Sequence, residues 1–395
     1  MGDSAGTLLG IAANPSAPPE VLVRLESLPG ALAVIAGRAD LDAEHAHRLH
    51  RDADTHTAIQ LAGNRHAPTA IREQLAEHPD AYVREAVARV GHVAERVLVR
   101  LALDHDRKVR LGVATGRHNT PLTHKALLVD GDAEVRRAVI ARADLTDALA
   151  AKALDDDWMM RRALAENPRI SGETVKALTD DPNPLVRAAV LTQHDVGEDV
   201  RARLYAELST VPVEPPPALG GTEADVETYL AAIQLDSALG VDSPWVRREP
   251  MDTQVKMLRS PYPFLRRAVA RNPKLPARNA SNLLTDADTW VRRYAARHPS
   301  TRADVLVAFT REFDGRSKVR HDYVLHPNFP ASALPRLAAE SEARLRLLAL
   351  DSPALPPVSV LTLLTDDDPL VTYRAARHPS HPLGAMHDLL TAAGR

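Results

Sequence analysis

The chain has 395 residues, of which 45% are apolar and only 4% aromatic, and it carries a net charge of −3 and no cysteine. The lack of cysteine excludes disulfides, thiolate metal sites and cysteine-bound iron–sulfur clusters, and we expect no cofactor. The near-balanced charge excludes a general attraction of the whole chain to nucleic acid or to an anionic membrane. Ala, Val and Leu must therefore fill most of the core, which favours closely packed helices.

The first residues of the chain do not resemble a targeting segment. Met1 to Pro15 lacks the basic start and the long apolar run of a signal peptide. No later stretch approaches the roughly 20 apolar residues that a membrane span needs. We therefore predict a cytoplasmic protein with no membrane partner.

Two segments near the N-terminus match each other. Leu32–Gly37 and Ala58–Gly63 have the same apolar pattern 26 residues apart, and a partial unit ends at Asn14-Pro15. The end of a repeat array has no neighbour on one side, so its sequence is free to diverge. We expect the first repeat to expose this side to solvent.

Several histidines lie between and around these segments, at His45, His47, His50 and His56. His47 and His50 share one face of a helix, as two metal ligands would. However, the sequence has no HExxH motif and no third ligand at a defined spacing. We predict no metal site.

From residue 83 onward one repeat motif recurs, most clearly in Leu265–Pro273 and Val291–Pro299. Its apolar positions are its first residue and the third and fourth residues after it, which form one face of an α-helix. Asn-Pro or His-Pro ends five of these helices, at residues 167, 272, 298, 326 and 378, because proline disfavours helical geometry in the residue before it. The motif begins at Val83, Val109, Val135, Met160, Val186, Leu265, Val291, Val319, Leu345 and Val371, mostly 25, 26 or 28 residues apart. This period predicts a solenoid, in which each repeat buries its apolar face against its neighbours.

A second, shorter apolar segment follows each of these helices, for example Val175–Leu178 or Val360–Leu364. A unit of this length has room for one helix of about ten residues and one of about seven, with two turns. An acidic turn, such as Asp180-Asp181-Pro182, then leads into the next repeat. We interpret its aspartates as helix caps rather than calcium ligands.

The repeat motif, its acidic turn and its Asn-Pro or His-Pro end resemble the leucine-rich repeat variant family, and HEAT-like repeats are similar in pattern. The resemblance covers roughly residues 55–208 and 250–390. It implies an all-α fold, a right-handed α-solenoid whose repeats of about 26 residues pair an α-helix with a short 3₁₀ helix. The founding member of that family carries an iron–sulfur cluster on cysteines, which this chain lacks, so the resemblance implies a fold and no cofactor.

The array is interrupted once. Pro212–Pro217 and the following Gly220-Gly221 predict a loop or extended polyproline structure. An amphipathic helix from about 224 to 239 and a damaged repeat at Trp245–Pro250 are expected after it. We predict three parts: a helical-repeat arm at 1–208, a Pro-rich interruption at 209–250 and a second helical-repeat arm at 251–395.

The second residue of the motif is arginine in most repeats. In HEAT-like repeats an arginine here pairs with the aspartate of the preceding turn and ties neighbouring repeats together. The resemblance therefore implies a structural ladder of Arg84, Arg110, Arg136, Arg161, Arg187, Arg266, Arg292, Arg320 and Arg346. A phosphate-binding ladder would instead require guanidinium groups that are free of these aspartates.

The second arm contains a basic region rich in aromatic residues. Residues 241–320 include 17 basic and 8 acidic residues, a net charge of +9, which leaves −12 for the rest of the chain. Ten of the fourteen aromatic residues lie between residues 229 and 329. Arg267 with Arg271 and Arg293 with Arg297 share exposed helical faces at a spacing of four, where like charges repel, and no pairing within a helix explains them.

Three functions fit these patterns. The first is a non-catalytic scaffold that binds a protein partner along the concave surface of the solenoid. The second is nucleic-acid binding by residues 241–320, in which arginines contact phosphates and aromatic rings stack on bases; its binding residues would be Arg267, Arg271, Trp290, Arg293, Tyr294 and Arg297.

The third function follows from a resemblance in architecture to HEAT-like DNA glycosylases, and it would use Asp286 or Asp288 beside Trp290. The sequence has no GxSxG motif, no Gly-rich phosphate loop and no carboxylate pair outside the repeated turns. We therefore take the scaffold as our prediction, with nucleic-acid binding as the alternative, and we assign no catalytic residue.

Overall fold

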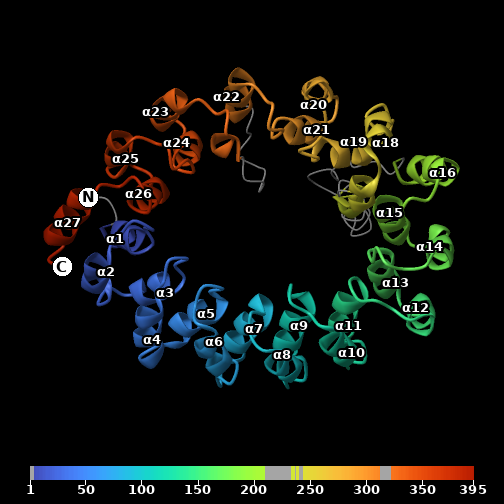
Figure 1. Cartoon of the computed structure of the whole chain (residues 1–395), viewed down its shortest axis with the longest axis horizontal. Helices are drawn as coiled ribbons and strands as arrows, with labels where there is room; N and C mark the ends of the chain where they lie inside the picture. Colours follow the sequence, from blue (N-terminus) through green and yellow to red (C-terminus); the bar gives the residue numbers. More distant parts are fainter. Residues whose placement is uncertain (1–3, 210–232, 236, 240–242, 312–321) are drawn as a thin grey trace, which may run out of the picture. The chain divides into compact units, whose positions relative to one another are not determined.

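The computed structural model of the chain describes residues 4–209, 233–235, 237–239, 243–311 and 322–395. All regular secondary structure in these ranges is helical, which confirms the predicted all-α class. The helices pack in series, mostly as pairs of neighbouring helices (Figure 1). Within the described ranges, no helix combines the length and the apolar character needed to cross a membrane.

The residue contacts divide the chain into two compact units. The first unit contains residues 1–123 and 299–395, so both ends of the chain belong to it, and the second contains residues 124–298. The predicted part boundaries near 208 and 250 both fall inside the second unit and remain a prediction. The Pro-rich segment from residue 210 and the predicted helix as far as residue 232 lie outside the described residues, whereas residues 233–235 and 237–239 are helical.

In the first unit, one layer contains helices that contact each other in series, and a second layer of helices packs on it. The first layer contains α1 (Ser4–Ala12), α3 (Ala31–Ala36), α5 (Thr55–Gly63), α7 (Ala81–Val90), α9 (Arg107–Thr115), η2 (Asp322–Leu325), α24 (Ala343–Ala349) and α26 (Pro369–Ala376). The second layer contains α2 (Pro19–Leu25), α4 (Ala43–Arg51), α6 (Thr69–Leu75), α8 (Glu95–Ala102), α22 (Ala303–Arg311), η3 (Ala331–Ala333), α23 (Leu334–Ala338), α25 (Pro357–Leu363) and α27 (Leu383–Ala392). Helix α10 (Pro121–Leu127) spans the boundary between the units.

The second unit has the same two layers. The first contains α11 (Ala133–Ile140), α13 (Trp158–Ala165), α15 (Pro184–Gln193), η1 (Pro244–Arg248), α19 (Pro263–Ala270) and α21 (Thr289–Ala295). The second contains α12 (Asp147–Leu154), α14 (Gly172–Thr179), α16 (Glu198–Ser209), α18 (Met251–Met257) and α20 (Ala277–Leu283). Most of the second-layer helices are α-helices of seven or eight residues, whereas the family resemblance implies 3₁₀ helices at these places.

Large side chains fill the core of the second unit where the repeat motif is interrupted. The 3₁₀ helix η1 lies at the damaged repeat and buries Trp245 in the same core as Phe264 of α19. The rings of Tyr205 and Tyr262 join this core, with centroids 5.0 Å apart in an edge-to-face arrangement. One hydrophobic cluster, from Leu185 to Ala295, therefore continues across the interruption of the repeat pattern.

The acidic turns cap the first-layer helices. The capping side chain accepts a hydrogen bond from a backbone N–H group in the first helical turn, which satisfies a donor that the helix leaves unpaired. These capping residues are Asp106, Asp132, Asn183, Asp288 and Asp368. A second aspartate, two residues earlier, accepts a hydrogen bond from the N–H group of the capping residue; these are Asp104, Asp130, Asp181, Asp286 and Asp366.

The arginines at the second motif position connect successive turns. Arg266 donates from Nη1 to the carbonyl oxygen of Ser260 in the preceding turn at 2.7 Å, and from Nε and Nη2 to the carboxylate of Asp286 in the following turn at 2.8 and 3.0 Å. The same two-oxygen pairing links Arg84 with Asp104, Arg161 with Asp181, and Arg346 with Asp366.

The expected pairing with the carboxylate of the preceding turn is therefore wrong for these four arginines. The preceding turn supplies backbone carbonyl oxygens, and the carboxylate comes from the turn after it. Arg110, Arg136, Arg187 and Arg292 also donate to carbonyl oxygens of their preceding turns. Arg320 lies outside the described residues.

In several repeats, an Asn or His after the first-layer helix connects the repeat to the preceding one. Nδ2 of Asn167 donates to the carbonyl oxygens of Ile140 and Ala143 at 2.7 and 2.8 Å, at the end of the helix one repeat earlier. Nδ2 of Asn64 donates in the same way to the carbonyl oxygens of Ala36 and Arg38. These side chains satisfy carbonyl groups that a helix end leaves unpaired.

Histidine can replace asparagine in this place because one of its ring nitrogens can donate a hydrogen bond and the other can accept one. Nε2 of His378 lies 2.9 Å from the carbonyl oxygen of Ser352, and Nδ1 accepts a hydrogen bond from the N–H group of Ser380 at 3.0 Å. Since Nδ1 is the acceptor, the ring is neutral and its hydrogen is on Nε2. The helix that His378 caps is therefore that of the preceding repeat, α24.

The first and last repeats of the chain contact each other, at a site that we call the terminal junction: the contacts of α1 and α2 with α26 and α27 (Figure 1). Nδ2 of Asn14 donates to the carbonyl oxygens of Ala376 and His378 at 3.0 and 2.8 Å. Asn14 is fully buried. The expectation that the first repeat exposes this side to solvent is therefore wrong, because the last repeat covers it.

Candidate binding surface on helices α19 and α21

All six predicted binding residues lie on α19, α21 and the turns that follow these helices. The acidic turn before α21 holds its N-terminus, and the repeat spacing places the end of α21 beside the end of α19. The structure therefore brings the six side chains to one region of the second unit. Their environments differ, however, and they do not form a uniform row of exposed cations.

Arg267 is bound to an aspartate of the next repeat. Its Nε and Nη2 atoms donate to the two carboxylate oxygens of Asp288 at 3.0 and 2.6 Å, and both side chains are only 14% exposed. Burial disfavours the charged carboxylate, but the hydrogen bonds from Arg267 and from the backbone of Val291 outweigh this effect and lower the pKa of Asp288. The spacing of residues within one helix does not indicate this pair, because Asp288 belongs to the next repeat.

Two arginines lie against aromatic rings. The guanidinium carbon of Arg271 is 4.9 Å from the ring centroid of Tyr294, and that of Arg293 is 5.1 Å from the ring centroid of Trp290. The two rings are 6.0 Å apart at an angle of 31°. Such cation–π contacts contribute about 0.5–1 kcal/mol each at exposed sites and more when water is excluded. We call Arg271, Tyr294, Trp290 and Arg293 the stacked cluster.

A small hollow of about 190 Å³ lies beside the stacked cluster. Arg271, Asn272 and Pro273 line one side of it, and Tyr294, Arg297 and His298 line the other. Ligand pockets for whole small molecules usually measure roughly 300–1,000 Å³. This hollow therefore has room for a single side chain or a small anionic group.

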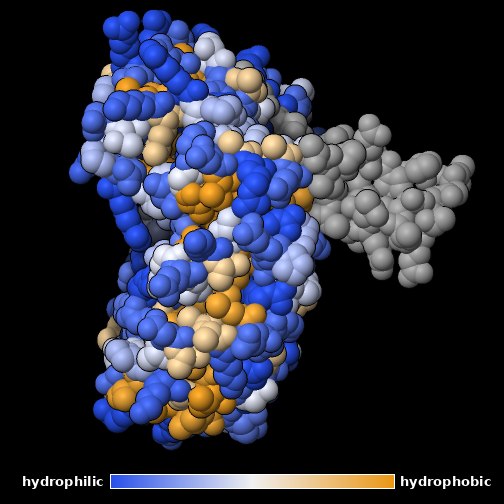
Figure 2. All heavy atoms as spheres, turned by 90° about the vertical axis from the view of Figure 1, so that its right-hand side faces the viewer, coloured by the Kyte–Doolittle hydropathy of each residue, from blue (hydrophilic) through white to orange (hydrophobic). Residues whose placement is uncertain are grey.

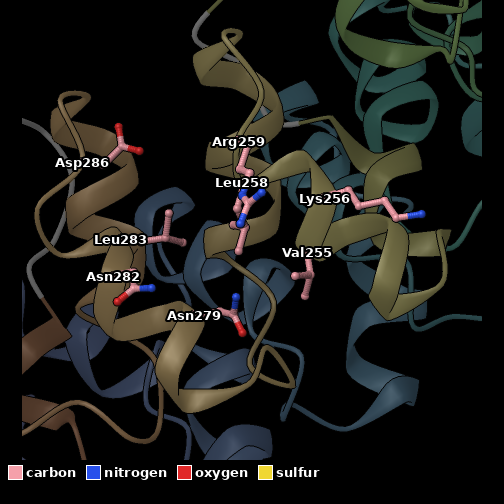
Figure 3. Close-up of a pocket in the computed structure, with 8 residues that line it drawn as sticks. All are labelled: Val255, Lys256, Leu258, Arg259, Asn279, Asn282, Leu283 and Asp286. Atoms are coloured by element: carbon pink, nitrogen blue, oxygen red, sulfur yellow. The ribbon is translucent and has the colours of Figure 1, made fainter.

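A larger pocket of about 550 Å³ lies between α18 and α20 (Figure 3). Lys256 and Arg259 come from α18 and the turn after it, and Asn279 and Asn282 come from α20. Val255, Leu258, Leu283 and Asp286 complete its lining. This pocket was not among the predicted sites, although each pair of polar residues has the three-residue spacing that places side chains on one helical face.

The two aspartates considered for glycosylase chemistry have structural partners. Asp286 accepts hydrogen bonds from Arg266, and Asp288 accepts them from Arg267. Both also accept a backbone N–H group, as helix-capping carboxylates do. Their geometry is thus that of the other repeated turns in the chain.

The histidines near the N-terminus have other surroundings. His45 is buried, and its Nε2 atom is 3.1 Å from Oε1 of Glu26. In the described part of the chain, no group of three or more His, Asp or Glu side chains is placed to hold a metal ion.

The side of the molecule that carries α14 and α16 is mostly hydrophilic, with apolar side chains in small separate clusters (Figure 2). Monomeric proteins commonly expose single apolar residues, and only large continuous apolar patches indicate an interface. We therefore place the candidate binding surface at the stacked cluster, which is defined by paired charges and rings rather than by apolar area.

No family model matches this sequence, and no curated protein matches it significantly. The resemblance to leucine-rich repeat variant and HEAT-like proteins therefore remains a prediction.

Proposed function

We propose that the chain is a right-handed α-solenoid of the leucine-rich repeat variant or HEAT-like type and that it acts as a non-catalytic scaffold. Its repeats of about 26 residues would bind a protein partner along the concave surface of the solenoid. The serial packing of the helices and the recurring contacts between successive turns support the first part of the proposal.

The stacked cluster is the observation that supports protein binding. Trp, Tyr and Arg are the side chains that most often dominate the binding energy of protein interfaces. Here rings and guanidinium groups already lie against each other, so less side-chain entropy is lost when a partner binds. The small hollow beside the cluster fits one side chain of the partner, and the arginines around it favour an acidic one.

Nucleic-acid binding is less well supported by the same region. A phosphate-binding surface needs cations that are not neutralised, but Arg267 is paired with Asp288 in a bidentate arrangement. The rings of Trp290 and Tyr294 each have an arginine on one face, which reduces the ring surface available to bases. Nucleic-acid binding therefore remains an outcome that the experiment must distinguish.

The test is affinity capture from a cell extract with the tagged chain and with its Arg271→Ala, Arg293→Ala double variant. A protein partner should be captured by the wild type, should remain after nuclease treatment, and should be reduced about tenfold by the loss of two stacking contacts. Lys274→Ala with Arg278→Ala is the matched control, because it removes two positive charges from exposed positions in the same unit. This control should capture the partner as the wild type does.

Two results would contradict the proposal. Equal capture by the wild type and the Arg271/Arg293 variant would show that the stacked cluster is not the binding site. Capture that disappears after nuclease treatment would favour nucleic acid. Fluorescence anisotropy with labelled single-stranded DNA at two salt concentrations would then measure the expected steep loss of affinity with salt.

A further inference from the structure

The terminal junction has the same geometry as the contacts between successive repeats inside the chain. A Cβ atom on Gly10 of α1 would lie 2.5 Å from the carbonyl oxygen of Tyr373 and 2.7 Å from Cβ of Ala376. A Cβ atom on Gly112 of α9 would meet the carbonyl oxygen of Glu85 and Cβ of Ala88, both at 3.2 Å. Tyr373 and Ala376 occupy the same motif positions in α26 that Glu85 and Ala88 occupy in α7. Helix α1 therefore packs on α26 as α9 packs on α7.

Asn14 also makes the hydrogen bonds by which an asparagine connects successive repeats elsewhere in the chain. Its amide donates to the carbonyl oxygens of Ala376 and His378, as the amide of Asn167 donates to those of Ile140 and Ala143 one repeat earlier. In both contacts, the first repeat packs on the last repeat as the next repeat of the array would.

The second layer contributes further hydrogen bonds to the junction. Nη1 of Arg24 is 2.9 Å from Nδ1 of His387, and its Nη2 donates to the carbonyl oxygen of Arg395 at 2.5 Å. Oγ of Ser16 donates to the carbonyl oxygen of Pro379 at 2.9 Å. Both layers thus contribute to the contact.

The two sides of the junction are different surfaces. One side consists of α1 and α2, and the other consists of α26 and α27. Two unlike surfaces of this kind can meet within one chain, or one surface can meet the opposite surface of another copy. The contacts are the same in both cases. The chain has no cysteine, so no disulfide fixes its ends to each other.

We propose that the terminal junction is an exchangeable interface whose second possible partner is another copy of this chain. The α1–α2 surface of one copy would pack on the α26–α27 surface of the next, with the contacts that otherwise form within one chain. The intramolecular junction dominates at low protein concentration, because its formation does not depend on protein concentration, whereas that of the intermolecular junction does. Blocking that junction should therefore favour the intermolecular one.

The test mixes two variants that each retain one intact surface. Gly10→Leu places a side chain where the backbone of Tyr373 lies, which damages the α1–α2 surface. Ala376→Leu damages the opposite surface, because Ala376 is fully buried against Gly10. Each variant alone should remain monomeric, whereas an equimolar mixture at about 100 µM should form a species of twice 42.9 kDa in light scattering after size-exclusion chromatography.

Gly63→Leu is the matched control for the first variant. Gly63 is also helical, but an added Cβ atom there would meet no atom within 4 Å. Its mixture with Ala376→Leu should give no dimer, because Gly63→Leu keeps both surfaces intact and closes its own junction. Circular dichroism and cooperative urea unfolding establish that each variant is folded.

A second measurement does not depend on Ala376→Leu. Wild-type chain refolded from urea at about 100 µM should contain a dimer that is absent after refolding a hundredfold more dilute. Gly10→Leu refolded in the same way should contain none. If folded variants stay monomeric in the mixture, and if the wild type yields no dimer on concentrated refolding, the proposal is wrong.

Discussion

The side-chain amide of Asn14 donates a hydrogen bond to the carbonyl oxygen of Ala376, a residue 362 positions further along the chain. Elsewhere the same contact joins residues in adjacent repeats, as between Asn167 and Ile140. The end of the sequence is thus held to its beginning by the contact that holds each repeat to the one before it.

We expect Asn14→Ala to destabilise the chain about as much as Asn167→Ala. Each change leaves two buried carbonyl oxygens without their donor, which costs on the order of 1–3 kcal/mol. Equilibrium urea unfolding of both variants measures the comparison. If Asn14→Ala left the free energy of unfolding unchanged while Asn167→Ala lowered it, the terminal junction would not contribute to stability.

Arg161→Ala should be among the most destabilising changes in the arginine ladder. The carboxylate of Asp181 is 4% exposed and accepts two hydrogen bonds from Arg161, so removal of the guanidinium leaves a buried charge without its partner. Breaking one side of such a pair costs roughly 3–5 kcal/mol. The double variant Arg161→Ala, Asp181→Ala should recover part of this loss in a double-mutant cycle. Strictly additive losses would mean that the two side chains do not interact.

Arg267 and Arg271 should have opposite roles although they lie four residues apart on one helix. Arg267→Ala removes the bidentate partner of Asp288, so it should lower the free energy of unfolding by about 1–3 kcal/mol and leave partner capture unchanged. Arg271→Ala should reduce capture and lower the free energy of unfolding by at most about 1 kcal/mol, because Arg271 is exposed and loses only its contact with the Tyr294 ring. Thermal unfolding and capture of both variants measure the two effects, and the reverse pattern would assign binding to Arg267.

The chain should lose stability as the pH falls below about 6.5. Burial lowers the pKa values of His194, His378 and His381 in the folded chain below their ordinary value. Between the unfolded and folded pKa values the unfolded chain binds more protons, so acidification favours unfolding. The contribution of each histidine is complete above pH 7 and is lost as the pH falls toward its folded pKa.

His378→Asn should remove part of this pH dependence without removing the cap. Asparagine performs the same two functions at Asn64 and Asn167 and does not titrate. Urea unfolding at pH 7.5 and 5.5 measures the difference, and His47→Asn, a change at an exposed histidine, should behave as the wild type does. An unchanged difference in His378→Asn would exclude protonation of this ring as a cause.

Much of the helical pattern could be predicted because it depends on local sequence. The apolar face, the capping aspartate and the proline stop all lie within about fifteen residues, as in Val291–Pro299 and its preceding turn. The binding region was harder to interpret, because the partner of Arg267 is 21 residues away in the next repeat. The ring partner of Arg271 is Tyr294 in the next repeat, whereas Arg293 contacts Trp290, three residues earlier on its own helix.

The terminal junction could not be predicted from a repeat pattern. Asn14-Pro15 identifies a partial repeat, and Gly10 is a small residue at the position where helices approach closely. Neither residue indicates which surface will cover it, because that depends on the path of the chain between residue 14 and residue 376. Local sequence therefore predicts the type of contact but not the partner.

The two sides of the terminal junction are synthesised at different times. Asn14 is added to the nascent chain 362 residues before Ala376, and at 5–20 residues per second this interval is on the order of 20 to 70 s. Throughout that time the apolar face of α1 has no α26 to cover it. The nascent chain therefore exposes this face of α1 to chaperones and to neighbouring nascent chains on the same messenger RNA until α26 has been made.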